Sequence, residues 1–136
     1  AEAEAQPVGD PAQPGPQIGP LASAAQWDKV QRLIEEGASS GARLVAGGPG
    51  RPDGLQRGYY ARPTVFADVP PHASISREEI FGPVLCIAPF DSEADAVALA
   101  NDTTYGLTSY VQTSDAARVR RVSRALRAGM VVANGA

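Results

Sequence analysis

The sequence predicts an α/β fold in which helices pack on a parallel or mixed sheet. In the second half of the chain, short apolar runs alternate with helical patterns, which is typical of strand–helix–strand crossovers. Of the 136 residues, 43% are hydrophobic and 20% are charged, so the chain has the composition of a domain with a core. We expect a single folded piece with three successive parts.

Residues 1–22 form a lead-in rich in glycine and proline, which break helices and sheet ladders. We expect it to be a surface loop. The next pattern is helical, because four apolar residues recur on one face: Trp27, Val30, Leu33 and Ile34. Ser23 is its expected N-cap, and the helix should end near residue 39 or 40.

The middle part, residues 23–83, holds this helix, two hairpin-like strands and a turn. The strands are expected at residues 42–46 and 59–69, and a second glycine–proline loop over residues 47–58 joins them. Pro63 marks the later strand as an edge or irregular strand, because proline cannot donate to the ladder.

Residues 84–136 are expected to form a strand–helix–strand–helix–strand unit. Its first strand, residues 84–90, is a continuous apolar run, which predicts a strand covered on both faces. The first helix should begin at Ser92, and the second at Ser114 or Asp115. The five elements are expected at residues 84–90, 92–101, 108–112, 115–127 and 130–133.

Charge and residue usage exclude several classes of function. The net charge of −3 gives no strong field for nucleic acid or anionic membrane, and no apolar run reaches the roughly 20 residues of a membrane span. With one cysteine, Cys86, and one histidine, His72, we expect no internal disulfide and no metal site. Cys86 lies in an apolar strand, which favours a core residue over a reactive thiol. We expect a cytoplasmic protein.

The densest group of chemistry-bearing residues is the run Ser-Arg-Glu-Glu-Ile-Phe-Gly-Pro, residues 76–83. Its two adjacent acids, Glu78 and Glu79, should point apart and have different roles. A carboxylate can accept hydrogen bonds from the vicinal hydroxyls of a ribose, and a phenyl ring offers a flat wall to a heteroaromatic ring. The alternative is a turn that only leads into the next strand.

Several motifs, in order along residues 8–135, resemble those of the NAD(P)-dependent aldehyde dehydrogenase superfamily. The strongest is E-E-I-F-G-P-V at residues 78–84. The others are V-G-D-P and I-G-P-L at 8–11 and 18–21, G-Y-Y and P-T-V-F at 58–60 and 63–66, A-N-D-T and Y-G-L at 100–103 and 105–107, and A-G with Val132 and Asn134 at the end.

The resemblance implies an oxidoreductase that converts an aldehyde to a carboxylic acid with NAD or NADP, in a homo-oligomeric parent enzyme. It implies that Glu79 binds the hydroxyls of the nicotinamide ribose and that Phe81 lies against the nicotinamide side of the cofactor. Asn134 falls in a segment that approaches the active-site funnel in such enzymes. The chain would be the C-terminal part of the catalytic domain.

In this family the nucleophilic cysteine and the general-base glutamate lie upstream of the G-D-P motif, so the resemblance places both before residue 1. We therefore expect no catalytic residue in this chain and no aldehyde oxidation by the chain alone, since acyl chemistry of this kind needs both groups. The alternative is a truncated, non-catalytic relic that acts by interaction or self-association, because uncovered apolar faces promote association.

Overall fold

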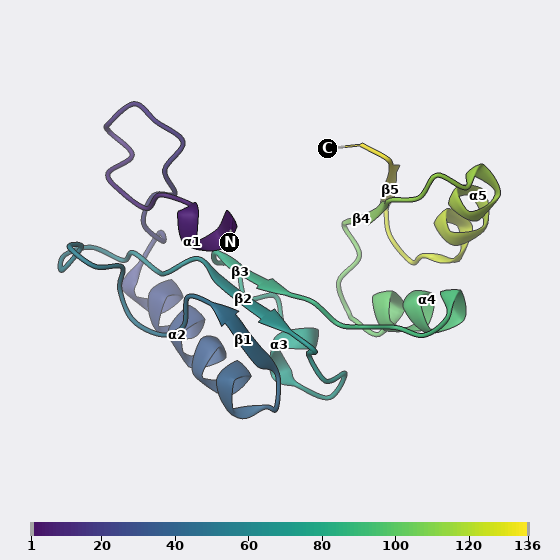
Figure 1. The fold of residues 1–136 in the computed structure, drawn as a ribbon, viewed down its shortest axis with the longest axis horizontal. Coiled ribbons are helices and arrows are strands. Elements are labelled where there is room, and N and C mark those ends of the chain that lie inside the picture. The colour runs from purple at the N-terminus through teal and green to yellow at the C-terminus, as the bar shows by residue number, and fades with distance from the viewer. Residues whose placement is uncertain (1, 136) are drawn as a thin grey trace. The chain divides into compact units, whose positions relative to one another are not determined.

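The computed structural model describes residues 2–135, which form two compact units. The first unit extends to Pro89 and the second begins at Phe90. The chain is therefore an α/β protein with two separate sheets, one in each unit (Figure 1).

The first unit contains a mixed three-stranded sheet in the order β1-β2-β3. Strands β1 and β2 are antiparallel, as the expected hairpin requires, and β2 and β3 are parallel. The elements of this unit are α1 (Glu2–Ala5), α2 (Ala24–Ser39), β1 (Arg43–Ala46), β2 (Thr64–Ala67), α3 (Ser74–Arg77) and β3 (Val84–Cys86).

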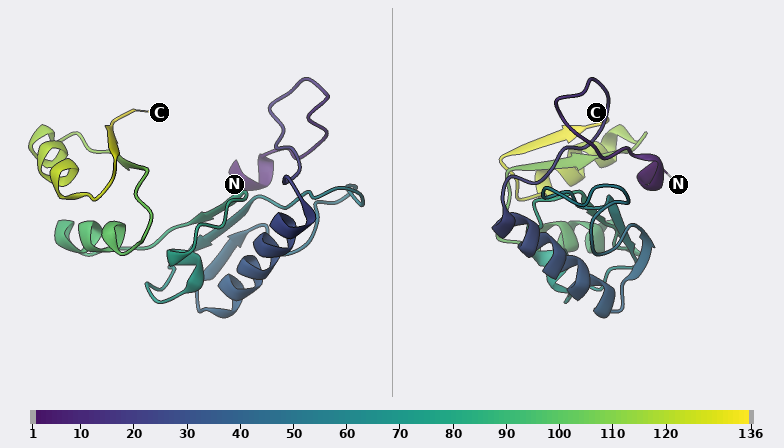
Figure 2. Two further views of the ribbon diagram at one scale, coloured as in Figure 1. Left: turned by 180° about the vertical axis from the view of Figure 1, so that it is seen from behind. Right: turned by 90° about the vertical axis from the view of Figure 1, so that its left-hand side faces the viewer.

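Helix α2 lies against one face of this sheet (Figure 2). The Ser23 side chain caps it by accepting a 3.2 Å hydrogen bond from the backbone N–H of Gln26, as the sequence predicts. The predicted apolar stripe is buried against Phe66 of β2, which has no exposed surface. Trp27, at the edge of the stripe, is half-buried and donates from its indole N–H to the carbonyl of Tyr60 at 3.1 Å.

The two glycine–proline stretches are loops, as predicted. The first closes on itself through an isolated bridge between Val8 and Ile18. The second is held by hydrogen bonds from the N–H groups of Gly48 and Gly50 to Thr64 Oγ1 and Gln31 Oε1, at 3.1 and 2.5 Å. One turn of helix, α1, lies within the expected lead-in loop, because its E-A-E-A residues favour helix.

The expectation that the run 84–90 is a strand covered on both faces is wrong. Strand β3 ends at Cys86, and Leu85 and Ile87 are 56% and 48% exposed. Only the opposite face packs on the core, through Val84 and Cys86. An apolar run shows which residues could be buried. Which of them are buried depends on the helices and strands that pack against the sheet.

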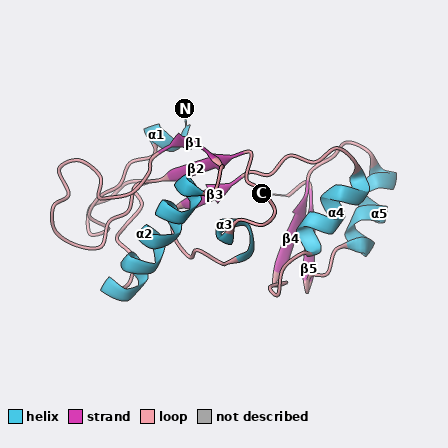
Figure 3. Cartoon of the chain, turned by 90° about the horizontal axis from the view of Figure 1, so that it is seen from below, coloured by secondary structure: helices cyan, strands magenta, loops and turns pink. Residues whose placement is uncertain are grey.

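The second unit contains β4 and β5, paired in parallel, with two helices beside them (Figure 3). Its elements are α4 (Glu93–Asn101), β4 (Thr108–Val111), α5 (Ala116–Ala125) and β5 (Met130–Ala133). The predicted order of elements is confirmed, but the expected strand–helix–strand–helix–strand unit is divided. Strand β3 pairs with β2 in the first unit and not with β4.

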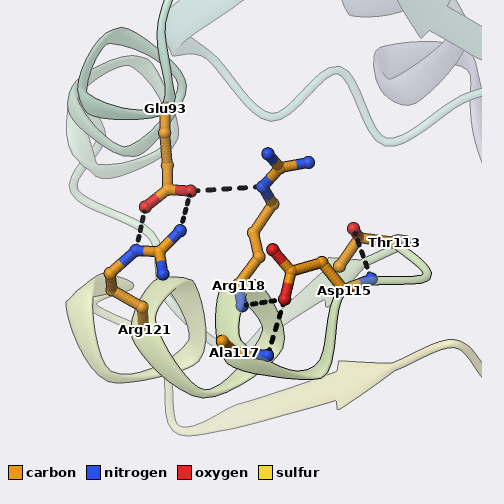
Figure 4. A network of polar contacts seen from close by, with 6 residues as sticks. All are labelled: Glu93, Thr113, Asp115, Ala117, Arg118 and Arg121. Carbon is orange, nitrogen blue, oxygen red and sulfur yellow. Dashed lines mark hydrogen bonds and ion pairs between the residues drawn. The ribbon is translucent and has the colours of Figure 1, made fainter.

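Polar contacts join the two helices of the second unit (Figure 4). The Glu93 carboxylate, in the first turn of α4, accepts hydrogen bonds of 2.6 and 2.7 Å from Arg121 of α5 and lies 3.3 Å from Arg118 Nε. Asp115 caps α5 by accepting from the N–H groups of Ala117 and Arg118 at 2.8 and 3.1 Å. Ser92 caps α4 in the same way, through the Asp95 N–H at 3.1 Å.

Apolar surface in the second unit remains accessible. Neither α4 nor α5 has a buried residue, and Leu107 and Tyr110 are 87% and 64% exposed. A hollow of about 740 Å³ lies among α4, α5 and β4 and is lined by Val97, Tyr110 and Val122 among others. Among residues 2–135, every helix is too short or too polar to span a lipid bilayer.

Candidate cofactor-binding turn

The turn of residues 78–83, called here the 78–83 turn, connects α3 to β3 and is anchored along its length. At its start, the Glu78 N–H donates to the carbonyl of Ser74 at 2.8 Å and ends α3. In its middle, Ile80 is 8% exposed and belongs to the core of the first unit. At its end, the carbonyl of Pro83 accepts from the N–H of Thr64 at 2.8 Å. The turn therefore has a fixed place beside α2 and β2.

Helix α2 holds the turn by hydrogen bonds to three successive carbonyl groups, which we call the α2 clamp. Lys29 Nζ donates to the carbonyl of Glu79 at 2.6 Å. Gln26 Nε2 donates to the carbonyls of Ile80 and Phe81 at 3.1 and 3.0 Å. The sequence prediction missed both residues. Their i, i+3 spacing on one helix is visible in the sequence, but the partner segment lies about fifty residues away.

With its carbonyls held from α2, the turn presents two side chains to solvent. Glu79 is exposed, and Phe81 is 71% exposed, whereas Ile80 between them points into the core. Phe81 has a φ of 59°, in the left-handed region that residues other than glycine rarely adopt. Such a conformation persists only where surrounding contacts impose it, and residues of this kind cluster at functional sites. Asp68 and Asn134 also have positive φ in this chain.

The two adjacent acids of the turn have different surroundings, as the sequence predicts. Glu78 lies 3.7 Å from Arg32 of α2, which also pairs with Glu36 at 2.5 Å. Hydrogen bonds from Ser74 and then from Arg32 lower the pKa of the Glu36 carboxyl below its ordinary value. Glu78 therefore belongs to an ion-pair group that joins the turn to α2, whereas Glu79 is an exposed acid whose carbonyl is held by Lys29.

A carboxylate and an aromatic ring two residues apart on a held turn suit a ligand with hydroxyl groups and a flat ring. The carboxylate accepts hydrogen bonds from vicinal hydroxyls, and the exposed phenyl face packs against a heteroaromatic ring. Both features are present in a nicotinamide riboside. A hydrogen-bond acceptor and an aromatic face on one turn are compatible with such a ligand.

The third candidate, Asn134, lies in the second unit, directly after β5. Its φ is 53°, its N–H donates to the carbonyl of Val111, and its Oδ1 accepts from the N–H of Thr113, both at 2.9 Å. These bonds join the end of β5 to the end of β4. The structure gathers Glu79 and Phe81 in one turn and gives Asn134 a local role in a different unit.

Cys86, the lone cysteine, is half-buried in β3 and packs on the core of the first unit. Burial raises the pKa of its thiol, so the nucleophilic thiolate is disfavoured. Within residues 2–135, no three histidine, cysteine, aspartate or glutamate side chains gather as they would around a metal ion.

Comparison with known proteins identifies the family. A model of the aldehyde dehydrogenase family matches residues 1–136. The chain is 52% identical over 129 residues to a 3-succinoylsemialdehyde-pyridine dehydrogenase from Pseudomonas sp., a match that covers 95% of this chain and 27% of that relative. The chain thus spans little more than a quarter of the relative's length.

Solved structures agree with the sequence comparison. An aldehyde dehydrogenase from Bartonella henselae has 56% sequence identity and a TM-score of 0.97, over 99% of this chain and 28% of that one. A mutant of aldehyde dehydrogenase C from Pseudomonas syringae, in complex with NAD+ and octanal, has 48% identity and a TM-score of 0.94, over 98% of this chain and 28% of that one. The chain belongs to the aldehyde dehydrogenase family.

Proposed function

We propose that this chain supplies the nicotinamide-ribose contacts of an enzyme that oxidises an aldehyde to a carboxylic acid with NAD+ or NADP+. The observation that supports the proposal best is the pair Glu79 and Phe81, both exposed on a turn that α2 holds by three hydrogen bonds. The Pseudomonas syringae relative, solved with NAD+ and octanal, supports the same chemistry for this chain.

In this proposal, Glu79 accepts hydrogen bonds from the ribose hydroxyls and Phe81 limits where the nicotinamide ring can lie. The bound cofactor supplies the acceptor for the hydride that leaves the substrate carbon. When the ring is held in one place, the reacting atoms are already aligned and less entropy is lost on reaching the transition state. This is how a positioning contact lowers the activation barrier. The chain thus contributes orientation and not covalent chemistry.

We further propose that the chain on its own does not oxidise aldehydes. A covalent aldehyde adduct needs an activated thiolate with a base beside it. Cys86 is the single cysteine, and burial raises the pKa of its thiol. The nucleophile would therefore come from the remainder of a parent enzyme, which we propose to be a cytoplasmic homo-oligomer. The one cysteine of this chain cannot form a disulfide within it, which is compatible with a reducing compartment.

The test is a segment exchange in the 3-succinoylsemialdehyde-pyridine dehydrogenase, whose matching segment is 52% identical over 129 residues. The exchanged enzyme should oxidise its semialdehyde with NAD+. Glu79→Gln should raise the KM for NAD+ by about tenfold or more, because a hydrogen bond to a charged group is lost. Glu78→Gln is the matched control, since Glu78 faces Arg32. Equal effects of the two substitutions, or none from Glu79→Gln, would contradict the proposal.

A second candidate function is association through apolar surface, favoured by the second unit. Its helices have no buried residue, and Leu107, Tyr110 and Met130 are more than half exposed. Exposed apolar groups in one place promote contact with another chain or another copy. Light scattering of the purified chain over a range of concentrations tests this function, and a monomer at every concentration would exclude self-association.

A further inference from the structure

The 78–83 turn contains a strained residue, Phe81, next to the α2 clamp. Phe81 has a φ of 59°, where the Cβ of an L-residue crowds the following carbonyl group. Without contacts that oppose it, Phe81 would return to negative φ and its ring would point in a different direction. The conformation therefore needs contacts that hold the peptide groups on both sides of Phe81.

The α2 clamp supplies those contacts. Gln26 has two amide hydrogens on Nε2, and its two bonds to the carbonyls of Ile80 and Phe81 use both of them. Lys29 holds the carbonyl of Glu79 at 2.6 Å through a charge-assisted hydrogen bond. Three successive peptide planes are thus fixed from one helix. Because the planes on both sides of Phe81 are fixed, the Cα–Cβ direction of Phe81 is fixed as well.

We infer that Gln26 and Lys29 are positioning residues for the cofactor: they act through the backbone of the 78–83 turn to hold Phe81 in its left-handed conformation and to fix the peptide group between Glu79 and Ile80. The inference rests on the proposed function. It adds a property that the free chain shows without any cofactor. The conformation of Phe81 should depend on two side chains of α2.

The first experiment is NMR on the 136-residue chain without ligand. A strong NOE between the amide proton and the Hα of Phe81 reports positive φ. We expect it in the unmodified chain and in Lys29→Arg, which keeps a charged donor. We expect it to weaken in Gln26→Glu, a substitution of equal size that removes both donors, and to vanish in Gln26→Glu/Lys29→Met. Asp28→Asn, on the exposed side of the same helix, is the control.

Folding is checked in the same spectra through the amide signals of Leu33 and Phe66, two core residues distant in sequence from the turn. If the double variant unfolds, the single Lys29→Met and Gln26→Glu variants decide the result. A Phe81 signal of positive φ that persists in every folded variant overturns the inference, since the conformation would then be intrinsic to the turn.

The second experiment measures the KM for NAD+ in the exchanged enzyme described above. Gln26→Glu should raise it roughly tenfold with a smaller change in kcat, and Lys29→Arg should preserve it. If the variants lose the left-handed Phe81 but keep their KM, the positioning role in cofactor binding is overturned. If Glu79→Gln also leaves KM unchanged, the proposed function fails as well, so the two failures are distinguishable.

Discussion

Gly82 lies closer to Val30 than a residue with a Cβ atom could. A Cβ built on Gly82 would lie 2.8 Å from Val30 Cγ2 and 3.1 Å from Val30 Cγ1. Val30 is fully buried in α2, so its side chain has no space into which to move. The glycine is thus what lets the 78–83 turn approach the helix closely enough for the α2 clamp to form.

Gly82→Ala should destabilise the first unit by about 1–3 kcal/mol, the usual cost of forcing an extra methyl group into a packed core. Urea unfolding followed by Trp27 fluorescence measures the change. In Gly82→Ala/Val30→Ala the space is restored, so the double variant should lose less stability than the two single losses added together. Simple additivity would show that the two residues do not compete for the same space.

Phe81→Gly should be more stable than Phe81→Ala by about 1 kcal/mol, because only glycine adopts a left-handed conformation without steric cost. Both variants lose the ring, which is 71% exposed, so their difference isolates the backbone. Leu85 in β3 provides the control. It lies in an extended strand, where glycine should be less stable than alanine. The same order at both positions would contradict a strained Phe81.

The unequal burial of Phe66 in β2 and Leu85 in β3 predicts unequal effects of two apolar substitutions. Phe66→Ala should cost about 3–5 kcal/mol, because the ring is fully buried. Leu85→Ala should cost less than about 1 kcal/mol, because most of the side chain is already in water. Chemical denaturation of both variants checks the order. A large loss from Leu85→Ala would mean that the face it occupies is covered in solution.

The ion pairs of Glu93 predict a pH dependence in the second unit. Hydrogen bonds and charge from Arg121, then Arg118, lower the pKa of the Glu93 carboxyl below its ordinary value. In the unfolded chain the pKa of a glutamate carboxyl is about 4.3, and in the folded chain the pKa of Glu93 lies below that value. Stabilisation by the pairs is present above that value and is lost as the pH falls through the folded pKa.

Glu93→Gln should therefore lower the free energy of unfolding of the second unit at pH 7, and the difference from the unmodified chain should shrink as the solution is acidified. Urea titrations at several pH values, followed by the amide signals of α4 and α5, measure it. Asp91→Asn, a nearby exposed acid, serves as the control. A difference that stays constant down to acid pH would show that the carboxylate charge is not what stabilises the helix pair.

Local elements were predictable because their causes are local. Ser23 and Ser92 both cap helices as predicted, since an N-cap hydrogen bond joins residues three apart. The stripe from Val30 to Ile34 is buried as its period implies. The 78–83 turn was recognisable as a candidate site from its residue types alone, since adjacent acids and an aromatic ring before Gly-Pro form an uncommon combination.

Pairing between distant segments was not predictable in the same way. The run of residues 84–90 and the strand at residues 108–112 read as successive strands of one unit, but β3 pairs with β2 and ends at Cys86. Strand propensity indicates that a segment can pair with another strand, but it does not indicate which strand it pairs with. For the same reason, the sequence showed Gln26 and Lys29 only as polar residues on a helix.

The sequence by itself determined the α/β class, the helices with their caps, the glycine–proline loops and the motif that presents Glu79 and Phe81. These depend on spacing along the chain and on residue chemistry. Only the tertiary structure decided that the strands form two sheets, that one face of β3 is open, and that α2 holds Phe81 in a left-handed conformation. Each of these depends on contacts between segments far apart in sequence, whose energies no local pattern contains.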